Sequence, residues 1–193
     1  MNEQRLSDEF ERIKNAHKIS LRRTAARVVL GASVMRVFQK GTKDSLFPFL
    51  SKIEIDPLKE IKNQDHFKLW FQRELSKLAK LINIGNYNNK RIQPGYKWGH
   101  GAKVLTLYVR ELVLNSRYFY DHEVNRIQEW LYVPIDSIVI NRLRKLDIAL
   151  PFDRIKDIDT AEKFFDIQDK LHDAAKKIGV PKIWFDDNWG NRQ

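Results

Sequence analysis

The stretch "GYKWGHGAKVLTLYV", from Gly95 to Val109, places two glycines and a lysine immediately before an apolar run. Apolar residues recur at helical spacing from residue 102 to 115, which predicts a largely buried helix. Gly99 and Gly101 are typical of a turn before a helix, because glycine adopts positive φ and lets another backbone approach closely. The stretch therefore predicts a glycine turn followed by a core helix that carries Lys103 in its first turn.

The same helical period recurs along most of the chain, and no strand alternation of useful length interrupts it. We therefore expect an all-α fold, a compact multi-helix domain over residues 1–193 with one or two helical lobes. The first half is predicted to contain a helix capped by Ser7, a turn or loop at 41–49, a helix at 65–84 and a loop at 85–101. The helix at 102–115 is followed by a short helix at 121–132, which Pro134 ends. Two further helices are predicted: one capped by Asp136 or Ser137, and a last one capped by Asp159 or Thr160 and stopped by Gly179.

Composition limits the classes of function. The chain has 193 residues, of which 42% are hydrophobic, and no Cys. Without Cys there is no disulfide framework, thiolate zinc site or iron–sulfur cluster, and the five His have no spacing typical of a metal site, so we expect no metal and no cofactor. No apolar run approaches the roughly 18 residues that a membrane span needs. We therefore expect a cytoplasmic protein without a membrane partner.

The positive charge lies in one half of the sequence. Residues 1–103 hold 21 Lys and Arg against 10 Asp and Glu, a net +11, whereas residues 104–193 hold 14 against 15, a net −1. Such an asymmetry predicts a polyanionic partner, most commonly nucleic acid, although a solvated basic surface would have the same composition. Lys14, Lys18 and Arg22 recur every four residues, and their stripe would suit either a phosphate backbone or a solvated helix face.

The glycine turn predicts a phosphate-binding site. Amide groups at the start of a helix are free donors at the positive end of the helix dipole, and Gly99 and Gly101 would let a phosphate approach them. Trp98 and His100 belong to the same turn, so Trp98, Gly99, His100 and Gly101 are the candidate residues for contact with a nucleic-acid partner. The same pattern also fits a plain glycine turn followed by an exposed lysine.

A second motif, "VPID", ends in Asp136, which stands 33 residues after Lys103 (136 − 103). A glycine-turn lysine followed by V-P-x-D resembles the helix-hairpin-helix DNA glycosylases. The long interval is similar to that of their archaeal 8-oxoguanine DNA glycosylase branch. The resemblance covers about residues 95–143, and implies a helix-hairpin-helix-like element around residues 85–115. Two features depart from the family pattern: Pro94-Gly95 lies earlier than its usual L-P-G, and His100 stands at a commonly apolar position.

What the resemblance implies is a DNA glycosylase with lyase activity, acting on duplex DNA and associated with the nucleoid. Lys103 would be the nucleophile that expels a damaged base, such as 8-oxoguanine, through a Schiff base, and Asp136 would stabilise the positive sugar. A non-catalytic DNA-binding module would need only the basic half and the hairpin. A helical protein-interaction domain would need neither. The sequence leaves these three classes open.

Overall fold

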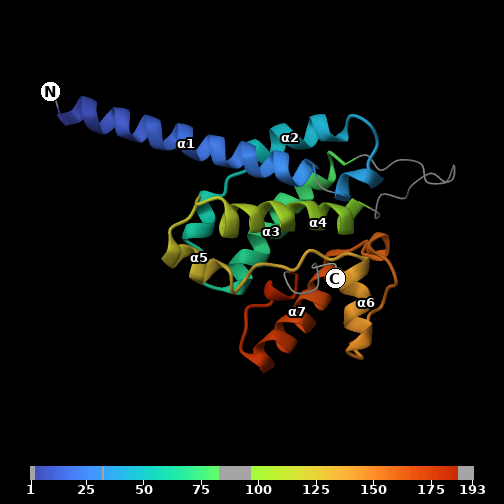
Figure 1. Ribbon diagram of the computed structural model, residues 1–193. Helices are drawn as coiled ribbons and strands as arrows, with labels where there is room; N and C mark the ends of the chain where they lie inside the picture. The colour runs from blue at the N-terminus through green and yellow to red at the C-terminus, as the bar shows by residue number, and fades with distance from the viewer. Residues whose placement is uncertain (1–2, 32, 83–96, 187–193) are drawn as a thin grey trace.

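Every regular element of the protein is helical within the ranges that the computed structural model describes, residues 3–31, 33–82 and 97–186 (Figure 1). This confirms the expected all-α class. Among these residues no helix has the length and apolar character that crossing a membrane requires. The elements are α1 (Glu3–Gly31), η1 (Ser33–Val37), α2 (Thr42–Lys52), η2 (Asp56–Lys59), α3 (Gln64–Ala79), α4 (Lys97–Arg110), η4 (Glu111–Asn115), α5 (Asp121–Ile127), α6 (Ser137–Lys145), η5 (Ile155–Asp157) and α7 (Ala161–Ile178).

α1 is a long helix that packs against α2 at its C-terminal end and projects away from the other helices at its N-terminal end (Figure 1). The prediction that Ser7 caps this helix was wrong, because α1 already begins at Glu3. The prediction of a loop at 41–49 was also wrong. Gly41, at φ 92°, precedes the helix α2, which contains Pro48 and buries Leu46 and Leu50. Burial of these leucines outweighs the local loop preference of glycine and proline.

α3 and α4 pack against each other at the centre of the molecule. α3 begins after Asn63, whose side chain accepts a hydrogen bond from the His66 amide, and it ends at Ala79, close to the predicted helix at 65–84. The predicted helix at 102–115 is confirmed by α4 and by η4, a π-helical turn that continues it. α4 begins earlier than expected, however, so residues 97–101 are helical rather than loop. The rest of the predicted loop and hairpin, residues 85–96, lies outside the described residues.

α5 is shorter than predicted, since it ends at Ile127, well before Pro134. A turn at residues 128–130 follows it, and residues 131–136 then run without helix to α6. Both predicted caps near the end of the chain are confirmed. Asp136 caps α6, while α7 is capped by Thr160 and stopped by Gly179, whose φ of 71° is left-handed.

The core is one cluster that draws buried apolar side chains from every α-helix. Its centre is aromatic: the rings of Phe71 and Tyr132 lie 4.9 Å apart, and those of Phe71 and Phe164 stack at 5.6 Å. Aromatic pairs at these separations stabilise a core beyond the area that they bury. The cluster joins α3 and α7 to the segment that precedes α6.

Candidate functional site

The structure brings together the two residues that the motifs single out. Lys103 Nζ lies 3.1 Å from Asp136 Oδ2, although the residues come from different elements and are separated by 33 positions. The Lys103 side chain is 15% exposed and that of Asp136 is 31% exposed. The pair is thus held within the fold but is still in contact with solvent, as a site for a large substrate must be.

Asp136 uses its two carboxylate oxygens separately. Oδ1 accepts hydrogen bonds from the amides of Ile138, at 2.9 Å, and Val139, at 3.1 Å, as the N-cap of α6. Oδ2 is therefore left to face Lys103. The positive end of the α6 dipole stabilises the ionised carboxylate, and the two amide bonds fix its orientation. Local sequence is enough to predict the cap, since Pro134 disfavours helix at the residue before it and Asp136 is the N-cap of the next helix.

Gln168 holds the extended segment that leads to Asp136. Its side-chain Oε1 accepts from the Val133 amide at 2.9 Å, and its Nε2 donates to the Val133 carbonyl at 2.8 Å. Gln168 is fully buried on α7. Its two hydrogen bonds satisfy the Val133 backbone groups in the way that a neighbouring β-strand would. Sequence reasoning missed this residue. The available signal was a polar side chain at an inward-facing position of an amphipathic helix, between Phe164 and Leu171.

The glycines do not form the predicted turn. Gly99 and Gly101 lie inside α4, and the positive-φ glycines of the described chain are Gly41 and Gly179. Gly99 and Gly101 instead allow close packing: a Cβ on Gly99, for example, would stand 2.2 Å from the Ile155 carbonyl oxygen. The Gly99 amide donates to the Ile158 carbonyl at 2.9 Å, so it is not a free donor for a phosphate.

Lys103 consequently stands six residues after the first residue of α4, not in its first turn. Trp98 is half-buried, with its ring 6.4 Å from those of Phe164 and Phe165 on α7. His100 is buried at 7% exposure, with an edge contact to Phe38 at 6.1 Å. Trp98, Gly99 and His100 therefore pack one end of α4 into the fold, and of the predicted site residues it is Lys103 and Asp136 that come together.

The predicted basic stripe of α1 is engaged by the protein itself. Lys14 pairs with Glu11 at 3.2 Å, and Lys18 contacts Asp56 at 3.1 Å. Arg22 donates to the Ile53 carbonyl at 3.3 Å. Lys18 thus anchors α1 to η2, and Arg22 anchors it to Ile53, the residue that follows α2. The aromatic residues near the motif divide between core and surface: Tyr118, Phe119 and Tyr132 are buried, Trp130 is half-buried, and Tyr120 is 63% exposed.

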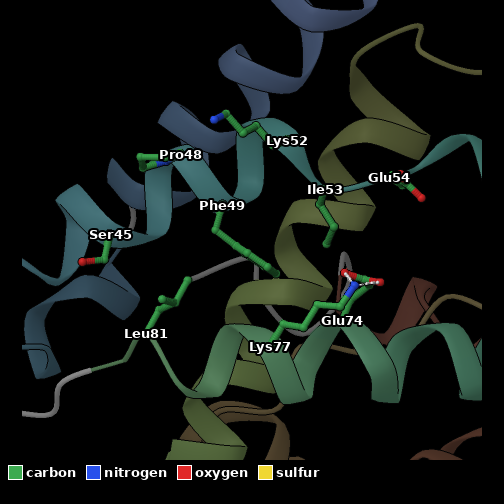
Figure 2. Close-up of a pocket in the computed structure, with 9 residues that line it drawn as sticks. All are labelled: Ser45, Pro48, Phe49, Lys52, Ile53, Glu54, Glu74, Lys77 and Leu81. Carbon is green, nitrogen blue, oxygen red and sulfur yellow. Dashed lines mark hydrogen bonds and ion pairs between the residues drawn. The ribbon is translucent and has the colours of Figure 1, made fainter.

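A cavity of about 490 Å³ lies between α2 and α3, and Figure 2 shows its lining. At its edge the buried Glu74 carboxylate is 2.9 Å from Lys77 Nζ and 2.7 Å from Arg73 Nε. None of its lining residues belongs to α4 or α6, so this cavity is separate from the Lys103–Asp136 pair. Its lining residues are Ser45, Pro48, Phe49, Lys52, Ile53, Glu54, Glu74, Lys77 and Leu81.

A buried lysine lies in the aromatic core. Lys182 is 1% exposed, its Nζ stands 4.6 Å from the Tyr132 ring centroid, and it makes no hydrogen bond within the described chain. Burial lowers the pKa of Lys182 to about 8, against the opposing effect of the Asp169 carboxylate. Burial likewise raises the pKa of the Tyr132 hydroxyl, which also lacks a hydrogen-bond partner among the residues described.

The described residues contain no group of three or more His, Cys, Asp or Glu side chains placed to hold a metal ion. Comparison with protein-family models, with curated proteins and with solved structures found no match to this chain. The pair of Lys103 and Asp136 is therefore the candidate site on its own chemistry.

Proposed function

We propose that this protein is a DNA glycosylase with lyase activity that excises a damaged base through a Schiff base on Lys103. The observation that carries the proposal is the 3.1 Å contact between Lys103 Nζ and Asp136 Oδ2. An amine beside an oriented, partly exposed carboxylate is the arrangement that attack on a sugar carbon requires. The pair is also the one that the glycine-lysine and V-P-x-D motifs predict from sequence, although Gly99 and Gly101 lie within α4 rather than in a turn.

In the proposed reaction, Lys103 first loses a proton from its amine, and Asp136 Oδ2 accepts it along the existing hydrogen bond. Nζ then forms a bond to the anomeric carbon of the sugar while the glycosidic bond breaks. The base leaves with the electron pair of that bond and takes up the proton held by Asp136, which restores the carboxylate. The ionised Asp136, with its orientation fixed by the α6 amides, then stabilises the positive charge left on the sugar and Nζ.

The lyase step follows from the same adduct. Opening of the sugar ring at its oxygen leaves a protonated Schiff base between the anomeric carbon and Nζ. The electron-withdrawing imine allows a base to remove a proton from the next carbon, and the 3′ phosphate is then expelled. No oxidant or reductant is consumed, so the proposal needs no cofactor.

The substrate proposed is duplex DNA, because the net charge of +11 over residues 1–103 favours a polyanion. A base within a duplex must be flipped out before a protein side chain can reach its sugar, at a cost of a few kcal/mol. A damaged or mismatched base lowers that cost. We therefore propose a lesion such as 8-oxoguanine as the target.

The experiment is a panel of duplexes, each with one lesion or abasic site, incubated with the protein and borohydride. We expect a covalent protein–DNA adduct with at least one lesion and with the abasic duplex, since borohydride reduces a Schiff base to a stable amine. Binding to every duplex without any adduct would instead indicate the non-catalytic DNA-binding module. Absence of both binding and adduct would leave the helical protein-interaction domain.

A further inference from the structure

The N-terminal half of α1 stands apart from the other helices (Figure 1). All residues from 4 to 17 are exposed, and α1 meets the body at Lys18, which contacts Asp56, and is first buried at Ala25. At 1.5 Å per residue these fourteen positions extend about 21 Å. An isolated helix of this length is marginal in water, so a partner that covers it would stabilise it.

One face of this projecting helix carries large apolar side chains. Leu6 is 42% exposed, Phe10 63% and Ile13 56%. The intervals of four and three residues place them on one narrow stripe, and the next position of the series is His17. This is the a/d spacing of a helix that packs against another helix.

The charges on α1 indicate which partner fits. Residues 4–11 carry three acidic side chains and one Arg, a net −2, whereas residues 12–18 carry Arg12, Lys14 and Lys18 and no acid, a net +3. A polyanion such as DNA would be repelled by the acidic tip. A second α1 in the antiparallel direction would instead place each acidic segment against a basic one, while a parallel pair would align like charges.

We propose that two copies of this chain associate through the projecting halves of α1, packed antiparallel along this apolar stripe. Phe10 and His17 are a positions of the heptad, and Leu6 and Ile13 are d positions. In an antiparallel pair each a position faces a d position, so Phe10 of each copy faces Ile13 of the other, and Leu6 faces His17. In this register Glu9 stands opposite Lys14, so these residues would exchange their pairs with Arg12 and Glu11 within one chain for a pair between chains. The two bodies lie at opposite ends of the pair.

The contact involves only residues 6–17 of each helix, so we expect a weak dimer that forms at micromolar or higher protein concentration. Its formation does not depend on the Lys103–Asp136 chemistry. Excision activity and association are separate measurements, and either can fail without the other.

The test is the molar mass of the full chain by sedimentation equilibrium between about 1 and 500 µM, a range suited to a micromolar association. We expect the mass to rise from 22.9 kDa toward twice that value. Phe10→Glu should abolish the rise, because it places charge in the stripe. Leu69→Glu is the matched control, since Leu69 is 66% exposed on α3, and it should dimerise as the unaltered chain does. A chain that stays at 22.9 kDa throughout would overturn the proposal.

Cysteine cross-linking tests the direction of the pair, because the chain has no Cys of its own. A mixture of Leu6→Cys and His17→Cys chains should form a disulfide under mild oxidation. Leu6→Cys alone should not, since in the antiparallel register the two Leu6 positions are eleven residues apart along the pair, about 16 Å, beyond disulfide reach. Efficient cross-linking of Leu6→Cys alone would indicate a parallel pair and contradict the proposal.

Discussion

At the residue scale, Asp136 combines two tasks that a substitution can separate. Asp136→Asn keeps an oxygen for the Ile138 and Val139 amides, so α6 stays capped, but it removes the negative charge that faces Lys103. We expect the free energy of unfolding to fall by about 1 kcal/mol or less, as for a partly exposed ion pair, and base excision to fall by orders of magnitude. Urea unfolding and single-turnover excision measure the two effects. Full activity in Asp136→Asn would reduce Asp136 to a helix cap.

Asp136 also marks what sequence can predict about a site. A proline followed by a capping residue is a local signal for Asp136, and the glycine-lysine and V-P-x-D motifs together predict Lys103 and Asp136 from the sequence alone. Gln168 was not identified, because its function depends on the Val133 backbone, which only the tertiary fold brings to α7. The roles of Gly99 and His100 likewise depend on neighbours distant in sequence.

Lys182 gives a prediction for the pH dependence of stability. Its pKa is lowered to about 8 in the fold, from 10.5 in its unperturbed state, so the unfolded chain binds more protons between these values and stability rises with pH there. The raised pKa of the buried Tyr108 and Tyr132 hydroxyls acts in the opposite direction above pH 10, where the unfolded chain loses protons first. The free energy of unfolding should therefore increase from pH 8 to about 10 and then decrease.

Lys182→Met tests this explanation. Met fills a similar volume without a charge, so the variant should be more stable at pH 7, by on the order of 3 kcal/mol if the whole shift is recovered, and the rise between pH 8 and 10 should disappear. Urea denaturation at each pH measures both. If the variant were less stable and its free energy of unfolding still rose between pH 8 and 10, the stabilising contact of Lys182 with Tyr132 would outweigh the cost of burying the amine.

At the scale of the elements, α4 depends on two glycines for different reasons. A Cβ at Gly99 would meet the Ile155 backbone oxygen at 2.2 Å, whereas at Gly101 it would meet the ends of the Leu75 and Leu78 side chains at 3.0 and 3.2 Å. A carbonyl fixed in the backbone cannot move aside as a leucine methyl can. We expect Gly99→Ala to lower the free energy of unfolding by about 2–4 kcal/mol. Gly101→Ala should change it by no more than about 1 kcal/mol, because alanine favours helix.

Equal stability of the two variants in urea unfolding would contradict this account of α4.

Helix ends such as those at Asp136, Thr160 and Gly179 were predictable, because capping is decided by the residues at the end itself. The helix α2 was not, because Gly41 and Pro48 favour a loop locally and the burial of Leu46 against other elements is a tertiary effect. The start of α4 was missed for the same reason, since packing against η5 and α7 extends the helix through Gly99.

At the scale of the whole molecule, the proposed function requires that the basic half of the chain bind DNA. Lys14, Lys18 and Arg22 already have partners within the protein, so other cations must supply most of the contacts. If about four to six phosphates are contacted, the logarithm of the affinity should fall with the logarithm of salt concentration at about −0.9 per contact. The loss would be about two to three orders of magnitude between 50 and 200 mM salt. Fluorescence anisotropy with a labelled duplex measures it, and an affinity independent of salt would exclude the phosphate backbone as the main contact.

The central claim, that Lys103 is the nucleophile of a glycosylase and lyase, is tested most directly by borohydride trapping on an abasic duplex. Lys103→Gln keeps a side chain of similar length without a primary amine, and should bind DNA nearly as well, since it removes one of 21 Lys and Arg in residues 1–103. Lys170→Gln is the matched control, because Lys170 also pairs with a carboxylate, that of Asp166 at 2.8 Å. We predict a trapped adduct with the unaltered chain and with Lys170→Gln, and none with Lys103→Gln. An adduct that persists in Lys103→Gln, or no adduct with any of the three proteins, would contradict the claim.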